Sequence, residues 1–406
     1  MATFRSHKDL KVYQASFSAA TEIFDISIAF PKDEKYSLTD QIRRVYGEDH
    51  KIKIMNFCGT HEWTIVRYGL RSILPRMIEL VAGPGCPVCV TPSYYIERLI
   101  EYSLEEKIVV YTFGDVYRLR SVKPVKGAYS LSEAKALGAD VRIVEGFADA
   151  VRDSLRHKRE SVFVGIGFET IAPGYARYIL HNKIPNNMSF LSLVKLTPPA
   201  MFYSLEILQD KPTEPVIAGV IAPGHVSTII GAKSWRPVVE HFNIPVVVSG
   251  FEPIDVLISI FYILKLYLRG EARLLIEYER AVSWDGDLSA QSYIYKVFEV
   301  RDDVWRGIGY IPKSGLRLRE EYDKIDFLKR HGIKDLSPET WATDLSPGCR
   351  CAEIVLGKAL PRDCPLFMRK CTPEKPYGPC MVSIEGTCSI WARYGSQEIL
   401  EMRGVS

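Results

Sequence analysis

The chain has 406 residues, of which 47% are hydrophobic and 25% charged, with a formal net charge of +3. This composition is typical of a globular protein of two or three domains with a substantial core. The near balance of charges argues against a nucleic-acid partner, and the one brief basic run, Arg156–Arg159, reads as a solvated helix face. The longest apolar stretch, Val256–Leu268, is too short for a membrane span and predicts a buried helix.

The nine cysteines fall into two groups, three between Cys58 and Cys89 and six between Cys349 and Cys388. The N-terminus carries charge where a secretory signal needs an apolar core, so we expect a cytoplasmic protein with reduced thiols. Clustered thiols in a reducing compartment indicate metal binding or catalysis rather than structural disulfides. The sequence therefore predicts two sulfur-bearing sites that are far apart along the chain.

In chain order, a peripheral helical segment is expected over residues 1–45. Short Val- and Ile-rich runs follow, separated by stretches of helix length, and this alternation predicts parallel strands buried on both faces. The expected strands are 52–57, 79–82, 108–113, 162–166, 217–221 and 244–248. The predicted fold class is therefore α/β, with two parallel-sheet α/β domains at 46–205 and 206–300 and a small loop-rich domain at 301–406.

Two strand-turn-helix units resemble each other, one ending in His61 and the other in His225. An internal duplication would explain the similarity and would place one unit in each sheet, but chance similarity explains it as well. In either case, the turns after parallel strands line the ligand crevice of such folds. Cysteine and polar residues occupy these predicted turns: Cys58, His61, Cys86, Cys89, Asp115, Glu169, His225 and Glu252.

The stretch Gly83–Cys89 holds a Cys-x-x-Cys pair, Cys86 and Cys89, in a stiff Gly/Pro loop. This spacing allows the two sulfurs to close a small disulfide, and it favours a lowered thiol pKa. Half of a zinc site is the competing interpretation, but this region lacks a second pair of ligands to complete it. The pattern favours redox chemistry.

Cys58 follows a predicted buried strand and is followed by His61 and Glu62. A lone cysteine in such a place is often a small core residue. Here an imidazole can take the proton of the thiol, and a carboxylate can orient that imidazole. A thiolate is also a soft ligand for iron.

The tail segment around the last six cysteines is rich in proline and glycine, so it cannot bury much core by itself and needs a cross-link. A four-thiolate iron–sulfur cluster would supply one, and zinc bound by four cysteines is the alternative. Six thiols exceed either requirement, which implies four ligands and an additional pair. The tail cysteines are Cys349, Cys351, Cys364, Cys371, Cys380 and Cys388.

Together these motifs resemble the HypD family of [NiFe]-hydrogenase maturation proteins. The resemblance extends from about residue 50 to 395, which makes it highly specific. The matching segments are Cys58–Glu62, Gly83–Cys89, Thr112–Asp115, Gly167–Pro173, Ala222–Ser227, Gly250–Asp255, Trp305–Gly309, Pro312–Leu316, Cys349–Cys351, Asp363–Phe367, Cys371–Pro373 and Gly378–Gly386.

The resemblance implies a scaffold on which the Fe(CN)2CO unit of the hydrogenase is assembled. It implies that Cys58 holds the iron together with a small HypC-type partner, and that a HypE-type partner delivers cyanide. Cys86 and Cys89 would act as a redox pair, with His61 and Glu62 handling protons. No membrane partner is expected.

The resemblance also implies a [4Fe-4S] cluster in the tail. The expected ligands are Cys349, Cys364, Cys371 and Cys388, with Cys351 and Cys380 as the additional pair. The choice between Cys349 and Cys351 stays open.

The sequence departs from the usual family pattern at three places. Trp63 and Val194 stand where the family commonly has histidine, and Tyr117–Ser121 lacks a usual Pro-Gly. Two other functions stay open at this stage: an iron–sulfur disulfide reductase that acts on a protein partner through Cys86 and Cys89, and a structural zinc protein. Whether the chain is an enzyme or a scaffold is not decided by its residues.

Overall fold

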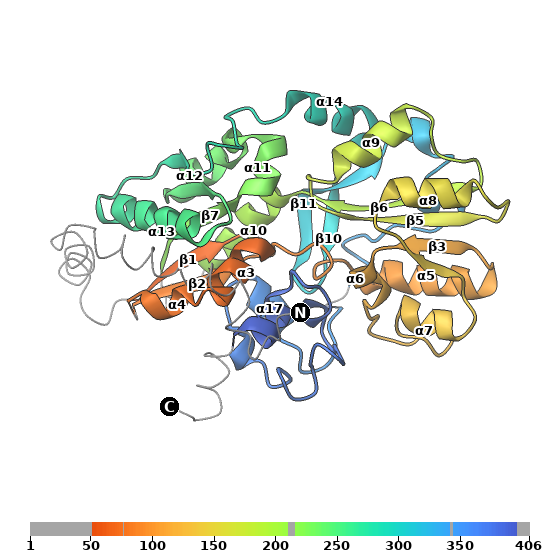
Figure 1. Ribbon diagram of the computed structural model, residues 1–406, viewed down its shortest axis with the longest axis horizontal. Coiled ribbons are helices and arrows are strands. Elements are labelled where there is room, and N and C mark those ends of the chain that lie inside the picture. The colour runs from red at the N-terminus through yellow and green to blue at the C-terminus, as the bar shows by residue number, and fades with distance from the viewer. Residues whose placement is uncertain (1–50, 76, 210–215, 342–343, 396–406) are drawn as a thin grey trace, which may run out of the picture.

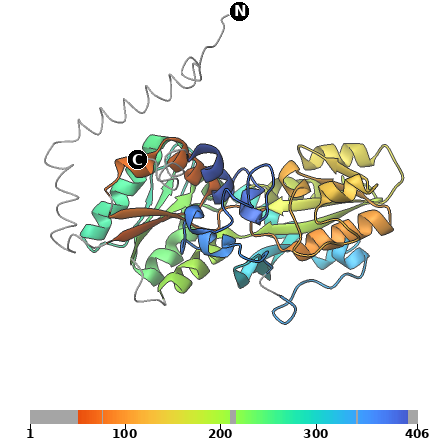
Figure 2. The ribbon, with the colours of Figure 1, turned by 90° about the horizontal axis from the view of Figure 1, so that it is seen from below.

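The computed structural model describes residues 51–395 apart from 76, 210–215 and 342–343. Two sheets stand side by side, each covered by helices, and the cysteine-rich tail lies between them (Figures 1 and 2). The helical segment expected at 1–45 lies outside the described residues. In the described part of the chain, no helix is long and apolar enough to cross a membrane.

The first sheet has five parallel strands in the order β2-β1-β7-β8-β9. The strands of this sheet are near-continuous apolar runs because helices cover both of its faces. Helices α3 and α13 pack on one face through residues such as Ile65 and Ile260, and α10 and α12 pack on the other. Its strands are β1 (Ile52–Asn56), β2 (Ile78–Ala82), β7 (Val216–Pro223), β8 (Val246–Ser249) and β9 (Leu274–Ile276).

The second sheet has six strands in the order β10-β11-β6-β5-β3-β4, of which β3 to β6 are parallel. An antiparallel ribbon, β10 and β11, joins it at the edge of β6. An aromatic cluster that includes Phe147, Phe163 and Phe190 fills one face. Its strands are β3 (Val109–Thr112), β4 (Val141–Ile143), β5 (Ser161–Gly167), β6 (Met188–Lys195), β10 (Phe298–Trp305) and β11 (Gly309–Leu318).

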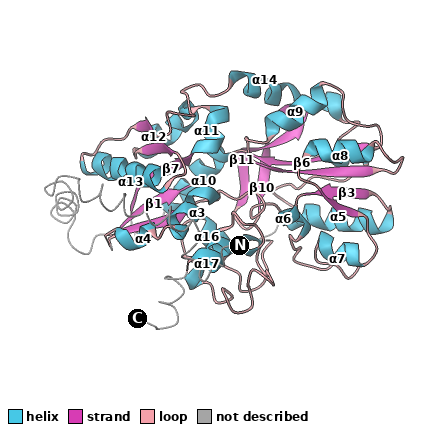
Figure 3. Cartoon of the chain, in the orientation of Figure 1, coloured by secondary structure: helices cyan, strands magenta, loops and turns pink. Residues whose placement is uncertain are grey.

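Helices connect the parallel strands, and only short helices interrupt the loops of the tail (Figure 3). The α-helices are α3 (Gly59–Arg67), α4 (Leu70–Ile73), α5 (Ser93–Glu105), α6 (Gly114–Tyr117), α7 (Leu131–Ala136), α8 (Phe147–Ser154), α9 (Ala172–Leu180), α10 (Thr197–Gln209), α11 (Gly224–Ile230), α12 (Arg236–Phe242), α13 (Pro253–Leu268), α14 (Leu288–Val297), α15 (Phe327–Arg330), α16 (Cys351–Val355) and α17 (Thr387–Tyr394). The 3-10 helices are η2 (Ala232–Trp235), η3 (Glu320–Tyr322), η4 (Pro361–Asp363) and η5 (Pro379–Met381).

The predicted α/β class with two parallel-dominated sheets and a cysteine-rich tail is confirmed. All six expected strands are present, and the apolar stretch at 256–268 lies in α13. The prediction missed the ribbon β10–β11 because β10 carries charged residues such as Glu299, Arg301 and Asp302 on its exposed positions. This run of charged residues lacks the apolar alternation by which a half-buried strand is recognised.

The strand pairing crosses the boundaries that the sequence suggested. β1 and β2, from the range 46–205, pair in the sheet of β7 to β9, whereas β10 and β11 reach into 301–406 and join β6. The two similar strand-turn-helix units do not stand in separate sheets, because β1 and β7 are parallel neighbours in one sheet. This corrects the expectation of one unit per sheet and brings His61 and His225 to the same sheet edge.

Candidate metal and redox site

Cys58 lies at the N-terminus of α3, directly after β1. Its backbone is extended (φ −151°, ψ 134°), and the helix begins at Gly59. The backbone N–H groups of His61 and Thr60 contact the thiol and favour its charged form, but burial outweighs them and, with the carboxylate of Glu385, raises the thiol pKa above its usual 9.0. A bound cation would therefore be needed to hold Cys58 as a thiolate at neutral pH.

Three segments meet at Cys58 with their backbones in contact. A Cβ atom at Gly85 would come within 2.7 Å of the Cys58 Cα, and Gly59 N donates to Gly85 O at 3.3 Å. On the other side, a Cβ at Gly59 would lie 2.6 Å from the carbonyl oxygen of Glu385. Glycine at positions 59 and 85 thus allows the Cys-x-x-Cys loop and the tail to touch the residue that is expected to hold iron.

Cys86 and Cys89 form a disulfide, with their Cα atoms 5.4 Å apart. Both residues are buried, and the backbone N–H of Cys89 contacts the Cys86 Sγ at 3.2 Å. The pair faces the tail, because a Cβ at Gly386 would come within 3.1 Å of the Cys89 Sγ. The disulfide therefore contacts the tail at Gly386, two residues before Cys388, and its loop contacts Cys58 through Gly85.

His61 is completely buried below Cys58 on α3. Its Nε2 donates to Gly250 O at 2.8 Å, and its ring stacks on Phe251 with centroids 4.9 Å apart. Burial lowers the pKa of the imidazole to about 4, so the ring is neutral at pH 7. Its Nδ1 has no partner among the described residues, which leaves one buried lone pair free to accept a proton.

Glu62 has different partners from those the sequence suggested. Its carboxylate accepts hydrogen bonds from Asn56 Nδ2 at 2.9 Å, Arg71 at 2.9 Å and the indole N–H of Trp391 at 2.7 Å. Trp391 belongs to α17, so Glu62 ties α3 to the tail helix. These contacts give Glu62 a positioning role and do not direct it at the imidazole of His61.

The other predicted turn residues divide between the site and the scaffold. Asp115 accepts a hydrogen bond from the hydroxyl of Ser383 at 2.8 Å, and so fastens the tail to the second sheet. His225 stacks on Phe251, at a centroid distance of 3.8 Å, as His61 also does. Each histidine thus packs against the same phenyl ring.

Two carboxylates of this set cap helices. Glu252 forms a capping box with Asp255 at the start of α13. Glu169 accepts from the backbone N–H of Thr197 at 2.7 Å, and burial raises its pKa to about 7. Neither of these contacts involves a cysteine.

The tail cysteines gather into one cluster. Cys351 contacts both Cys349 and Cys380, and Cys380 in turn contacts Cys388; these thiol–thiol contacts lower the pKa of Cys380 and raise the pKa of Cys351 and Cys388. A Cβ at Gly378 would lie 2.5 Å from the Cys349 Sγ, so the chain passes directly over that sulfur.

Cys371 receives two backbone N–H groups on its sulfur, from Tyr377 at 3.3 Å and Gly378 at 3.4 Å. Cys371 and Cys364 are close enough for their charges to interact. Bonds from backbone amides to cysteine sulfur are a recurring feature of iron–sulfur sites. In the described residues, no three His, Cys, Asp or Glu side chains already stand in a metal-binding geometry, so the tail offers a donor set that a metal would have to organise.

Comparison with known proteins identifies the family of this chain. The HypD family profile, described as the hydrogenase formation hypA family, matches residues 34–395. The chain belongs to the HypD family of hydrogenase maturation factors. It is 42% identical over 359 residues to a putative hydrogenase expression/formation protein of Methanocaldococcus jannaschii, a match that covers 87% of this chain and 95% of the relative.

Two HypD hydrogenase maturation factors are similar over almost the same region. The protein of Cupriavidus necator is 40% identical over 352 residues, which is 85% of this chain and 90% of the relative. That of Escherichia coli K12 is 36% identical over 358 residues, 87% of this chain and 92% of the relative. The resemblance drawn from the motifs is thereby confirmed.

The structure accounts for the two departures from the family's usual histidines. Trp63 packs edge-on against Tyr68 and against Tyr394 at the end of α17, with centroids 6.1 and 6.0 Å apart. Val194 is fully buried in β6 among apolar neighbours of the second sheet. At both positions this HypD protein has core packing instead of an imidazole.

Sequence reasoning assigned no role to Glu385 or Arg306 and placed Asp115 only in a turn at the crevice, although all three lie within the matching motifs. Glu385 influences the Cys58 thiol, Asp115 fastens the tail, and Arg306 acts on Cys349. Their partners lie between about forty and more than three hundred residues away in the sequence, so no local pattern indicates these contacts.

Proposed function

We propose that this HypD-family protein is a scaffold for assembly of the Fe(CN)2CO centre of [NiFe]-hydrogenase, with Cys58 as the ligand of the iron. The supporting observation is the junction at Cys58, where the Cys-x-x-Cys loop, the start of α3 and the tail meet in backbone contact. The iron here is cargo that is built up and passed on. A soft thiolate in a half-buried position suits low-valent iron and leaves its other coordination positions open to a partner.

Burial disfavours a free thiolate at Cys58, so the thiol keeps its proton until iron binds and loses it then. The N–H groups of Thr60 and His61 then stabilise the negative sulfur. In this proposal His61, which lies on the same helix and is neutral with a free Nδ1, accepts that proton and passes it on. Glu62 keeps α3 in register with the tail through Trp391.

In this proposal the tail holds a [4Fe-4S] cluster on Cys349, Cys364, Cys371 and Cys388. The N–H bonds to Cys371 and the gathering of six thiols support a metal–sulfur group there, whereas the contacts of Cys351 with both Cys349 and Cys380 leave the choice of the first ligand open. Such a cluster supplies one-electron transfer when it is bound.

Cys86 and Cys89 form the second redox group. Opening their disulfide takes two electrons and two protons and gives two thiols. Its contacts with both Cys58 and the tail support a role in delivering electrons while the diatomic ligands are attached to the iron. Cyanide would come from a HypE-type partner, and a small HypC-type partner would share the iron.

Infrared spectroscopy of the protein purified anaerobically with its small partner tests the proposal. We expect cyanide and carbonyl stretching bands in the wild type and in the control Ser103→Ala, which also truncates a buried side chain but lies in α5. We expect their loss in Cys58→Ala, which should keep its iron–sulfur absorption. Equal bands in Cys58→Ala and the wild type would contradict the assignment of the iron ligand.

A disulfide reductase acting on a protein partner is the second candidate, and the formed Cys86–Cys89 disulfide favours it. In that case Cys58→Ala would retain full activity toward the partner disulfide, and no infrared bands would appear in any sample.

A further inference from the structure

Arg306 is a buried cation between the Cys-x-x-Cys loop and the tail cysteines. It follows β10 in the tight turn to β11, and its side chain is 2% exposed. A buried guanidinium stays charged and is retained only where its hydrogen bonds or a nearby negative group offset the loss of hydration.

The backbone and side chain of Arg306 bind two segments that flank the cysteines. Its backbone N–H donates to the carbonyl of Val90, the residue after Cys89, at 2.8 Å. Its Nε donates to the carbonyl of Asp344 at 3.0 Å and forms an ion pair with the Asp344 carboxylate at 3.6 Å, and this carboxylate also accepts the backbone N–H of Ser93 at 2.6 Å. One residue thus joins the end of the disulfide loop to the chain that leads into Cys349.

The adjoining turn also lies against the first tail cysteines. A Cβ atom at Gly307 would come within 2.9 Å of Leu345 and 3.1 Å of Ala352, which flank Cys349 and Cys351.

One nitrogen of Arg306 lacks a partner. Its NH1 group is buried and makes no hydrogen bond within the described part of the chain. A buried donor without a partner costs desolvation free energy, so such a group in a folded protein calls for an acceptor.

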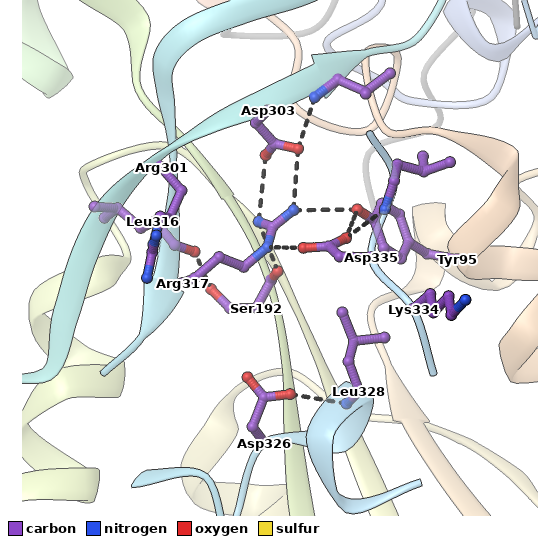
Figure 4. Close-up of polar contacts among 12 residues, drawn as sticks. Tyr95, Ser192, Arg301, Asp303, Leu316, Arg317, Asp326, Leu328, Lys334 and Asp335 are labelled. Atoms are coloured by element: carbon purple, nitrogen blue, oxygen red, sulfur yellow. Dashed lines mark hydrogen bonds and ion pairs between the residues drawn. The ribbon is translucent and has the colours of Figure 1, made fainter. Parts of the chain in front are cut away.

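A second buried arginine on the same ribbon provides the contrast. Every nitrogen of Arg317 in β11 is bonded to protein: Nε to Asp335 at 2.9 Å, NH1 to Ser192 O at 3.2 Å and NH2 to Asp303 at 3.0 Å (Figure 4). Arg317 is therefore complete without a ligand, whereas Arg306 is not.

We propose that Arg306 is a positioning residue that holds the Cys86–Cys89 loop against the tail cysteines and donates its spare N–H to the sulfur of the metal group held there. This inference rests on the proposed function, in which the tail carries an iron–sulfur cluster. A fixed cation and an added N–H···S bond both stabilise the reduced, more negative cluster and raise its reduction potential.

The test measures the reduction potential of the cluster in full-length protein by anaerobic spectroscopic titration, after iron and sulfide analysis of the wild type. For Arg306→Met we expect a tenfold or greater fall in the equilibrium constant for reduction, which is about 59 mV for one electron. Arg306→Gln removes the charge but keeps a polar side chain, and its equilibrium constant for reduction should fall as far. This variant replaces Arg306→Met in the test if the methionine variant loses its cluster. Arg306→Lys keeps the positive charge, so its equilibrium constant for reduction should stay within threefold of the wild-type value.

Arg317→Met is the matched control, because it also removes a buried arginine from the ribbon. It should lower the melting temperature at least as much as Arg306→Met and leave the cluster potential unchanged. A wild-type potential in Arg306→Met or Arg306→Gln, or an equal shift in Arg317→Met, overturns the inference. A wild type without iron and sulfide overturns the proposed function and this inference with it, an outcome seen before any variant is measured.

Discussion

The two groups of cysteines differ in how far the fold alone, without a metal, brings their sulfur atoms into a defined arrangement. Cys86 and Cys89 are already joined in a short loop that follows β2, with the first sheet behind it. The six tail thiols are collected from loops with only short helices between them, and they influence one another's pKa without standing in a coordination geometry. A local turn is enough to form a disulfide three residues apart, whereas a multi-cysteine site in a loop-rich segment depends on its metal.

The largest effect should come from removing a tail ligand. In Cys371→Ser we expect loss of the cluster and local unfolding of the tail, because the segment has little core of its own. Iron and sulfide content and hydrogen exchange over 346–395 measure this. The control Cys86→Ser changes the other cysteine group and should keep the cluster and the slow hydrogen exchange of the tail. Equal iron loss in both variants would contradict the difference between the two groups.

A smaller effect should come from cutting the tail helix away from α3. Glu62→Gln removes the charge that pairs with Arg71 and accepts from Trp391 in a buried place. Leaving the arginine without its partner should cost roughly 3–5 kcal/mol in the free energy of unfolding. Chemical denaturation measures it, and Glu240→Gln, which breaks the exposed pair with Arg236, should cost about 0.5 kcal/mol or less. Similar losses in the two variants would contradict a buried link.

The contact between the two cysteine groups can be forced apart at Gly386. In Gly386→Ala the added methyl would lie 2.2 Å from Cys380 O and 3.1 Å from Cys89 Sγ. We expect about 1–3 kcal/mol of destabilisation from overpacking. We also expect slower reduction of the Cys86–Cys89 disulfide, and alkylation of the released thiols measures this rate. Gly174→Ala in α9, where no atom lies within 4 Å of the new methyl, should leave the reduction rate unchanged. An unchanged rate in Gly386→Ala would show that this contact is not needed.

The smallest effect at neutral pH should come from His61. Its pKa is about 4 in the folded protein and near 6.5 when unfolded, so the unfolded chain binds more protons between these values. Stability therefore falls as the pH drops through this window, by roughly 2 kcal/mol at pH 5 relative to pH 7. His61→Gln, which keeps a donor for Gly250 O, should flatten this part of the stability curve. A slope equal to that of the wild type would mean that His61 is not the titrating group.

Sequence patterns predicted six of the nine parallel strands and missed β4, β6, β9 and the edge ribbon. Strands such as β1 and β5 are buried on both faces and show it as unbroken Val and Ile runs. β10 has its exposed positions filled by charges, and its partner β11 contains Pro312 and Gly315. The ribbon is stabilised by the pairing of β11 with β6, which lies more than a hundred residues earlier in the chain. No short stretch of sequence contains both strands.

The sequence alone determined the α/β class, the Cys-x-x-Cys pair and the family, because burial on both faces, a three-residue spacing and motif order are all local properties of the chain. Tertiary structure alone decided that β1 and β7 share a sheet, that Glu62 holds Trp391 of the tail, and that Arg306 stands between the two cysteine groups. These contacts join residues far apart in sequence, so no short stretch of the chain contains both partners of any of them.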